Sequence, residues 1–190
     1  MALEDQIKWD KKYQNTPTLL KQREPSKKLV QHIQQIKKGK ALEVACGAGR
    51  NSIYLAEQNF EVEALDISQI ALDTLKNQGY SNITTKLIDL DNYIPTENSY
   101  HLIVMTNFLD RKLIPHLSKA LKEDGILLIE TYMDHKINEK ESSNPDFLLK
   151  EGELKSFFDD SFEIVEYDEF LNENYELYKM MKQSIVVKKL

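Results

Sequence analysis

The chain has 190 residues, of which 41% are hydrophobic and 29% charged, a composition typical of one globular domain with a sizeable core. Lys and Arg total 25 against 31 Asp and Glu, and this net charge of −6 argues against a nucleic-acid partner. The lone cysteine, Cys46, excludes an internal disulfide and is typical of a reducing cytoplasm. We expect no signal peptide and no membrane partner, because residues 1–10 and the rest of the chain lack a long apolar run.

Apolar spacing and turn residues predict strands that alternate with helices. Helices are expected at residues 26–38, with Gly39 as C-cap, and at 50–58, 68–79 and 112–122. Strands are expected at residues 41–45, 60–66, 84–88, 101–105, 126–132, 162–171 and 178–187. This alternation predicts an α/β fold, a single Rossmann-like domain over residues 1–190 with a mostly parallel seven-stranded sheet and helices on both faces.

The end of the chain departs from that pattern. Residues 172–177 are too short a link for a parallel crossover, so the last two strands are expected to form an antiparallel hairpin. The polar stretch 133–144 shows no period and is expected to be the most flexible segment, while 145–158 looks helical near its end. We interpret residues 1–25 as an amino-terminal cap segment and residues 133–150 as a substrate loop or lid.

Chemistry-bearing residues follow the predicted strands, where ligands bind in a doubly wound sheet. Four strand ends carry them: Gly47 and Gly49, then Asp66, then Asp89, then Asn107 with Phe108. A tight turn or a solvated cap explains each residue alone. Their conjunction at one edge of the sheet predicts a pocket for a nucleoside cofactor.

Two nucleoside cofactors fit this layout, the anionic NAD and the cationic S-adenosylmethionine. Glu43, Asp66 and Asp89 place negative charge around the pocket, which favours an ammonium and a sulfonium over a pyrophosphate. The turn reads GAGRN and lacks the third glycine of a dinucleotide fingerprint. Both features favour S-adenosylmethionine, and an NAD-binding oxidoreductase is the alternative.

Several segments resemble the class I S-adenosylmethionine-dependent methyltransferases, and within them the tellurite-resistance-type small-molecule subgroup. The resemblance rests on WDKKY at residues 9–13, LEVACGAGRNSIYLAEQNFEVEALDIS at 42–68, YHLIVMTNFLDRKLIPHLSKALKEDGILLIETY at 100–132 and NPDFLLKEGEL at 144–154. It implies methyl transfer to a small-molecule acceptor, with S-adenosylhomocysteine as product. A non-catalytic protein that binds the same cofactor is a further alternative.

Carried over by position, the resemblance implies a set of cofactor-binding residues. The methionine part would lie against Glu43, Cys46, Gly47 and Gly49, the ribose on Asp66, the adenine beside Asp89 and Leu90, and the ammonium and reacting methyl group by Asn107. Ile67 is also expected to bind the cofactor. Tyr13 would close over the cofactor, with Trp9 one helical turn before it. Ala45 stands where the family commonly has glycine, and Glu43 replaces a more frequent aspartate. The methyl group of Ala45 requires an unstrained backbone, so we expect the turn to shift slightly.

Methyl transfer is an in-line displacement that needs no protein nucleophile, so no catalytic residue is assigned. A general base helps only if the acceptor must lose a proton, which a thiolate or a metalloid oxyanion need not do. The substrate-side candidates are Arg50, Phe108, Tyr132 and His135, with Asp134 beside them. The four histidines and one cysteine show no metal-ligand spacing, so no metal is expected.

Overall fold

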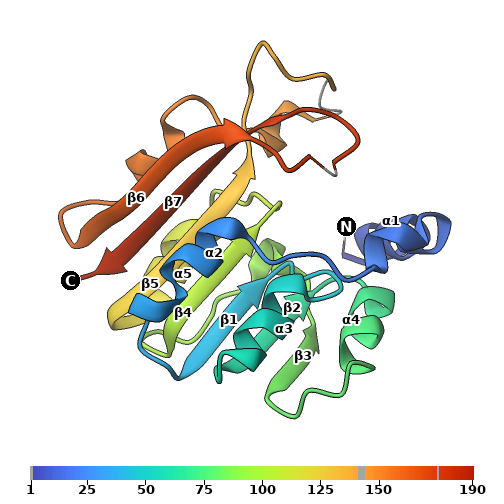
Figure 1. Ribbon diagram of the computed structural model, residues 1–190, viewed down its shortest axis with the longest axis horizontal. Coiled ribbons are helices and arrows are strands. Elements are labelled where there is room, and N and C mark those ends of the chain that lie inside the picture. Colours follow the sequence, from blue (N-terminus) through green and yellow to red (C-terminus); the bar gives the residue numbers. More distant parts are fainter. Residues whose placement is uncertain (1, 141–143, 175) are drawn as a thin grey trace.

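The computed structural model describes residues 2–140, 144–174 and 176–190, which form an α/β fold around one seven-stranded sheet (Figure 1). Its strands are β1 Lys40–Val44, β2 Glu61–Asp66, β3 Ile83–Leu87, β4 Tyr100–Thr106, β5 Leu121–Tyr132, β6 Phe162–Leu171 and β7 Met181–Lys189. They lie in the order β3-β2-β1-β4-β5-β7-β6. The pairs among β1 to β5 are parallel, and β7 runs antiparallel to both β5 and β6. The predicted fold class and hairpin orientation are confirmed.

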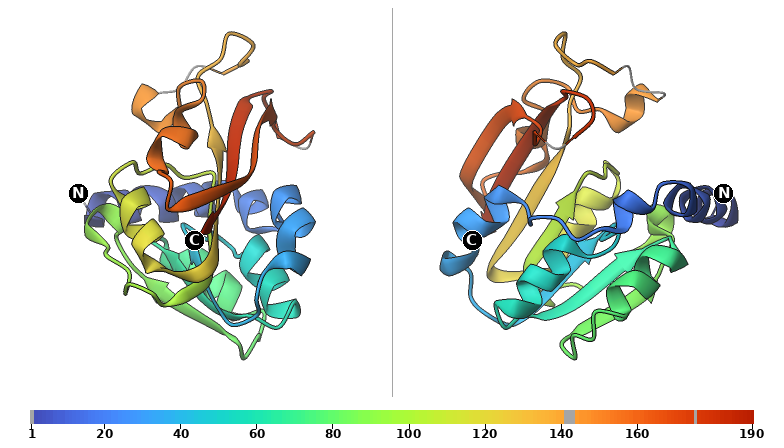
Figure 2. Two further views of the ribbon diagram at one scale, coloured as in Figure 1. Left: turned by 90° about the vertical axis from the view of Figure 1, so that its left-hand side faces the viewer. Right: turned by 45° about the vertical axis from the view of Figure 1, so that its right-hand side comes forward.

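Helices cover the two faces unequally. The α-helices are α1 Ala2–Asn15, α2 Lys27–His32, α3 Arg50–Glu57, α4 Gln69–Lys76 and α5 Leu113–Ala120. Figure 2 shows α2, α3 and α4 on one face and α5 on the other. Short 3-10 turns lie at Pro17–Leu20, Ile33–Gln35, Leu90–Asn92, Pro145–Phe147 and Glu153–Phe157. Over the described ranges, no helix is long and apolar enough to cross a membrane.

The sheet separates two hydrophobic cores, as the residues of β4 show. Leu102 and Val104 point into the core formed with α2, α3 and α4. Ile103 and Met105 point into the core formed with α5 and the turn Glu153–Phe157. All four are fully buried. Burial on both faces explains why the central strands read as continuous apolar runs rather than alternating ones.

The first predicted helix is shorter than expected. It begins after the N-cap Ser26, but its α-helical part ends at His32 and a 3-10 turn carries it to Gln35. Gly39 is therefore not its C-cap. A Cβ placed on Gly39 would lie 2.5 Å from Nδ1 of His101, so glycine is needed there for close approach to β4.

Three segments that follow β4 also differ from the prediction. β5 begins at Leu121, inside the predicted helix 112–122, with an irregular register against β4 between Tyr100 and Leu102. The link between β6 and β7 spans residues 172–180 rather than 172–177. The predicted helix within 145–158 is only two 3-10 turns, because the chain around Leu149 is extended and forms a parallel bridge with Met133. Part of the predicted flexible segment, residues 141–143, lies outside the described residues.

Candidate cofactor site

The turn after β1 is built from left-handed residues. Ala45, Gly47 and Gly49 have φ of +53°, +55° and +84°. The turn is fixed to the next strand because the Cys46 amide donates to the carbonyl of Leu65 at 2.8 Å. The expectation of an unstrained backbone at Ala45 is wrong, since its φ is one that costs an L-residue roughly 1 kcal/mol. The turn keeps a tight geometry despite the alanine.

Each glycine of the turn faces a side chain at close range. A Cβ on Gly49 would lie 2.3 Å from Cδ1 of Leu75, so the missing side chain lets α3 and α4 approach. A Cβ on Gly47 would lie 3.2 Å from Oη of Tyr13. Tyr13 comes from α1 and is buried, with its ring 5.9 Å from that of Trp9. Burial and the nearby Asp66 raise the pKa of the Tyr13 hydroxyl, so it stays protonated.

Asp66 ends β2 directly beside this turn. Its Oδ2 accepts a hydrogen bond from the Gly47 amide at 2.7 Å, and its Oδ1 accepts one from the Ser68 amide at 2.8 Å. Burial raises the pKa of Asp66, and these two amides act against that shift. Each carboxylate oxygen still has a lone pair for a second donor. The carboxylate is held rigidly between the glycine turn and the start of α4.

Glu43 and Cys46 lie beneath the turn rather than open at its surface. Glu43 is 1% exposed and accepts hydrogen bonds from Nδ2 of Asn51, at 2.9 Å, and from the hydroxyl of Ser52. Burial raises the pKa of Glu43 to about 7. Burial also raises the pKa of the Cys46 thiol well above its ordinary value, so the thiol is a poor nucleophile. Glu43 therefore anchors the first turn of α3, which starts at the glycine turn.

The predicted adenine-side residues gather at the ends of β2 and β3. The Ile88 amide donates to the carbonyl of Asp66 at 2.9 Å, which brings the two strand ends together. Asp89 is partly buried and caps the turn Leu90–Asn92 by accepting from the Asp91 amide at 3.1 Å. Leu90 is buried and Ile67 partly buried. These residues therefore lie next to Asp66 at one edge of the sheet.

The end of β4 carries Asn107 and Phe108. Asn107 is exposed, has a φ of +56°, and its amide donates to the carbonyl of Glu130 at 2.8 Å. Phe108 is partly buried and packs against the core on the α5 side. Phe108 therefore faces the hydrophobic core, and of the two residues only Asn107 is exposed at the carboxyl edge of the sheet.

The other substrate-side candidates lie in different surroundings. Arg50 is 3.7 Å from Oε1 of Glu173, and the Tyr132 hydroxyl donates to Glu176 at 3.2 Å. His135 instead lines a hollow of about 990 Å³ between the end of β5 and the segment 145–153. Among the described residues, the walls of this hollow include His135 and Asp134 but none of the other three candidates.

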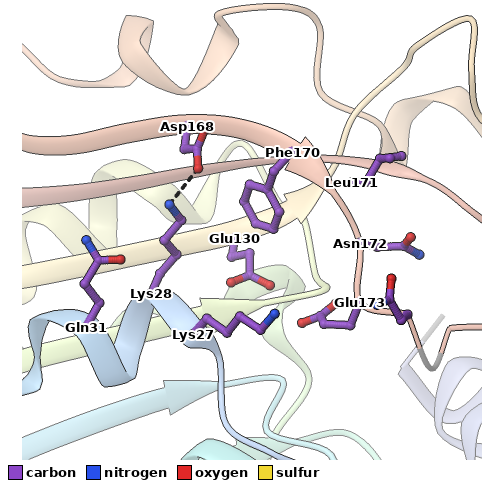
Figure 3. A pocket seen from close by; sticks show the side chains of 10 residues that line it. Lys27, Lys28, Gln31, Glu130, Asp168, Phe170, Leu171, Asn172 and Glu173 are labelled. Carbon is purple, nitrogen blue, oxygen red and sulfur yellow. Dashed lines mark hydrogen bonds and ion pairs between the residues drawn. The ribbon is translucent and has the colours of Figure 1, made fainter.

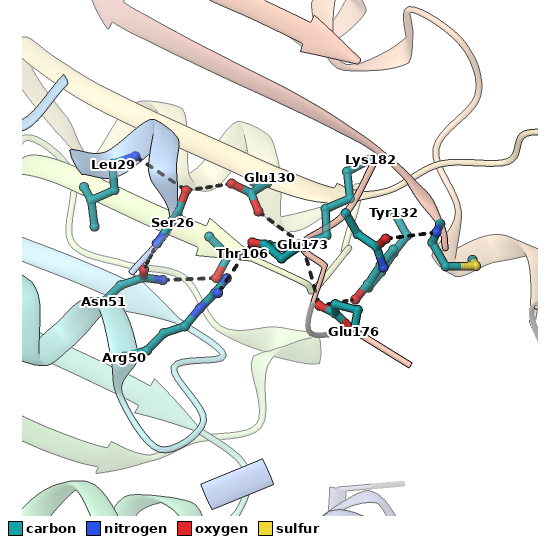
Figure 4. A network of polar contacts seen from close by, with 12 residues as sticks. Ser26, Leu29, Arg50, Asn51, Thr106, Glu130, Tyr132, Glu173, Glu176 and Lys182 are labelled. Atoms are coloured by element: carbon teal, nitrogen blue, oxygen red, sulfur yellow. Dashed lines mark hydrogen bonds and ion pairs between the residues drawn. The ribbon is translucent and has the colours of Figure 1, made fainter. Parts of the chain in front are cut away.

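A buried polar network at the ends of β4, β5 and β7 was missed at the level of the sequence (Figure 4). Lys182 is fully buried, with Nζ 3.2 Å from Glu130 and 2.8 Å from Glu173. The hydroxyl of Ser26 donates to Glu130 at 2.6 Å, and the Ser26 amide donates to Asn51, which also contacts Glu43. The network thus reaches from β7 to the glycine turn. Strand β7 reads MKQSIVVKK, so Lys182 is one of several polar residues in it and no local pattern in the sequence singles it out.

Beside this network, a hollow of about 400 Å³ lies between α2 and the end of β6 (Figure 3). It is lined by Lys27, Lys28, Gln31, Glu130, Asp168, Phe170, Leu171, Asn172, Glu173 and Asn174. Its charges are largely satisfied within the protein: Lys28 pairs with Asp168 at 2.7 Å, and Glu130 and Glu173 pair with Lys182. Neither of the two hollows is centred on the glycine turn.

Sheet order, antiparallel β7 and the glycine turn define the fold of the class I methyltransferases, and solved structures agree. The crystal structure of TehB from Haemophilus influenzae has a TM-score of 0.73 and 26% identity, covering 86% of this chain and 62% of that one. A methyltransferase structure from Methanosarcina mazei has a TM-score of 0.68 at 17% identity, covering 88% and 99% of the two chains. At that identity it shows the fold alone.

The sequence model of the family described as tellurite resistance protein TehB matches residues 1–188, so the chain belongs to that family. A Haemophilus influenzae protein named probable S-adenosyl-L-methionine-dependent methyltransferase TehB is 32% identical over 145 residues. The match covers 70% of this chain and 49% of that protein, so the chain spans about half the length of this curated relative. The resemblance recognised in the sequence is confirmed.

Proposed function

We propose that this protein binds S-adenosylmethionine at the carboxyl edge of β1 and β2 and transfers its methyl group to a small-molecule acceptor. One observation carries the proposal. Asp66 is fixed by the Gly47 and Ser68 amides between a left-handed glycine turn and the start of α4, with Tyr13 over the turn. A carboxylate held in this way can accept hydrogen bonds from both hydroxyls of a ribose.

The remaining cofactor contacts follow from the positions of the residues. Ile67, Asp89 and Leu90 adjoin Asp66 on the side where the adenine would lie. Gly47 would leave room for the methionine part between the turn and Tyr13, and Gly49 keeps the turn tight by letting Leu75 approach. Glu43 acts from below as a positioning residue for the turn. Asn107, exposed at the end of β4, would face the ammonium and the reacting methyl group. The acidic surroundings suit a cation.

The chain's own residues have a limited chemical task. When bound, the cofactor supplies an activated methyl group, so the protein has to align an acceptor and exclude water. Tyr13 and α1 would cover the adenosine side, and the ends of β4 and β5 would receive the acceptor. Arg50, Phe108, Tyr132 and His135 remain the predicted acceptor-side residues. A thiolate or a metalloid oxyanion would need no general base. We extend the proposal to a cytoplasmic location, which the lone cysteine supports.

Calorimetric titration with S-adenosylhomocysteine and, separately, with NAD tests the cofactor assignment. We expect the first to bind and the second not to bind. Asp66→Ala should weaken binding by at least tenfold, the approximate value of charge-assisted hydrogen bonds. Asp73→Ala is the matched control, because it removes an exposed aspartate from the neighbouring helix α4. Equal affinities for wild type and Asp66→Ala would place the ribose elsewhere.

Turnover needs a separate measurement, because a protein that only binds the cofactor would pass the titration. The purified protein is incubated with the cofactor labelled in its methyl group and with small thiols, tellurite or selenite. We expect label in at least one acceptor product and formation of S-adenosylhomocysteine. Binding without transfer to any of these acceptors would support the non-catalytic alternative.

A further inference from the structure

Helix α1 covers the predicted cofactor site with very little apolar burial. It lies beside α4 at the carboxyl edge of the sheet, as Figures 1 and 2 show. Among its described side chains, residues 3–15, Tyr13 is the one that is buried, while Leu3 and Ile7 are exposed. A helix with so narrow an apolar contact has low local stability. Its position must depend on particular polar contacts.

Asp10 supplies those contacts. Its Oδ1 accepts a hydrogen bond from the Ser68 hydroxyl at 2.5 Å and lies 3.3 Å from the Ile70 amide. Ser68 is the N-cap of α4, and its hydroxyl oxygen also accepts from the Ala71 amide at 3.2 Å. The first amides of a helix have no partner within the helix. Asp10 therefore completes the cap of α4 from a distant part of the chain.

The same turn holds the residue proposed to bind the ribose. Asp66 accepts from the Ser68 amide through Oδ1 and from the Gly47 amide through Oδ2. Asp10 of α1 contacts Ser68. Tyr13 follows less than one helical turn later, and its hydroxyl lies above Gly47. Helix α1 thus contacts the groups on both sides of the Asp66 carboxylate. Movement of α1 would therefore change the surroundings of Asp66.

We propose that Asp10, with its partners Ser68 and Ile70, is a latch that positions α1 over the cofactor site and couples α1 docking to cofactor binding. The inference rests on the proposed function, but Asp10 itself need not contact the cofactor. It lowers the free energy of the covered state, in which Tyr13 lies over the turn. Because the coupling is reciprocal, a bound cofactor also holds α1 in place.

The experiment compares S-adenosylhomocysteine binding by wild type, Asp10→Ala, Asp10→Asn and Asp5→Ala. Trp9 is the single tryptophan and lies on α1, so its fluorescence reports the state of this helix during the same titration. We expect Asp10→Ala to weaken binding about tenfold, as for loss of hydrogen bonds to a charged group. It should also shift the Trp9 spectrum before ligand is added. Asp10→Asn keeps an acceptor oxygen and should recover most of the affinity.

Asp5→Ala is the matched control, because it removes an exposed aspartate from the same helix and should behave as wild type. A double-mutant cycle with Ser68→Ala isolates the latch, since the effects of Asp10→Ala and Ser68→Ala should be less than additive. If wild type binds and Asp10→Ala binds equally well, the latch is overturned and the proposed function stands. If wild type itself does not bind, the proposed function is overturned and the latch with it.

Discussion

Two charged groups, Asp66 in the half of the sheet around β1 and β2 and Lys182 in the half around β5 and β7, are held by different means. Around β1 and β2, the backbone amides of Gly47 and Ser68 donate hydrogen bonds to the carboxylate of Asp66, and both residues are near Asp66 in the sequence. Around β5 and β7, the contacts are between side chains, and Lys182 forms ion pairs with Glu130 and Glu173 inside the protein. Backbone amides are ordered once the turn forms, whereas side-chain ion pairs require desolvation and ordering of long chains. Under the proposed function, the first half would hold the cofactor and the second half would receive the acceptor.

The largest effect is expected from breaking the buried ion pairs. Lys182→Ala leaves the buried Glu130 without its cation and should lower the free energy of unfolding by about 3–5 kcal/mol. Lys188 lies in the same strand, with Nζ 2.7 Å from Asp124 at the surface. Lys188→Ala should leave stability almost unchanged, because exposed pairs contribute little. Urea denaturation measures both, and equal losses would contradict the contrast between the halves.

The second effect concerns Glu43, the buried acid of the first half. Its pKa is raised from 4.5 to about 7, so the folded state holds this proton more tightly than the unfolded chain. Its contribution to stability is full below pH 4.5 and is lost as the pH rises to about 7. The loss should be roughly 3 kcal/mol. Urea unfolding of wild type and Glu43→Gln across this range isolates it, since the two curves should diverge, and a constant difference would contradict the assignment.

Substitutions at Gly49 and Gly79 distinguish the cost of a steric clash from the cost of a left-handed backbone conformation. Both have left-handed φ, but a Cβ would meet Leu75 at Gly49 and nothing within 4 Å at Gly79. Gly79→Ala should cost about 1 kcal/mol for conformation alone. Gly49→Ala should cost about 2 kcal/mol more, because it forces α3 and α4 apart. Thermal unfolding compares the pair, and similar costs would mean that the turn can relax.

The smallest expected effect is an increase in stability. Ala45→Gly removes left-handed strain and should raise the free energy of unfolding by up to about 1 kcal/mol. Ala48 lies in the same turn, with φ outside the left-handed region, so Ala48→Gly should not stabilise. Chemical denaturation of both variants measures these changes in the free energy of unfolding. If neither variant, or only Ala48→Gly, gained stability, the turn geometry would have to be revised.

The first half was also the more predictable one, for the same physical reason. An apolar run, two glycines and a strand-end acid are local signals, and they placed β1, α3, β2 and Asp66 to within a residue. The contacts of Lys182 with Glu130 and of Ser26 with Glu130 join residues 52 and 104 positions apart. No local pattern encodes such pairs. The start of β5 at Leu121 was missed because apolar spacing alone does not separate a helix end from a buried strand.

The contacts of Asp10, near β2, could likewise not be predicted from local sequence patterns. Its partner Ser68 was predicted as an N-cap from its position before an apolar helical pattern. That Asp10 contacts this cap from 58 positions earlier depends on how α1 docks, which the spacing of α1 does not specify. Glu43 was predicted beside the methionine part, which stays a prediction. Its contacts beneath the turn with Asn51 and Ser52 could not be read from the spacing of apolar residues.

The most direct test of the account is glycine-selective NMR with S-adenosylhomocysteine. The chain has 6 glycines, so each amide gives a resolvable signal. Gly47 and Gly49 lie at the carboxyl edge of β1, while Gly39, Gly79 and Gly125 precede strands or strand cores at the opposite edge. The account predicts saturable shifts of Gly47 and Gly49 with the other three unchanged. Shifts confined to Gly39, Gly79 or Gly125, or no shift at Gly47 and Gly49 under saturation, would contradict it.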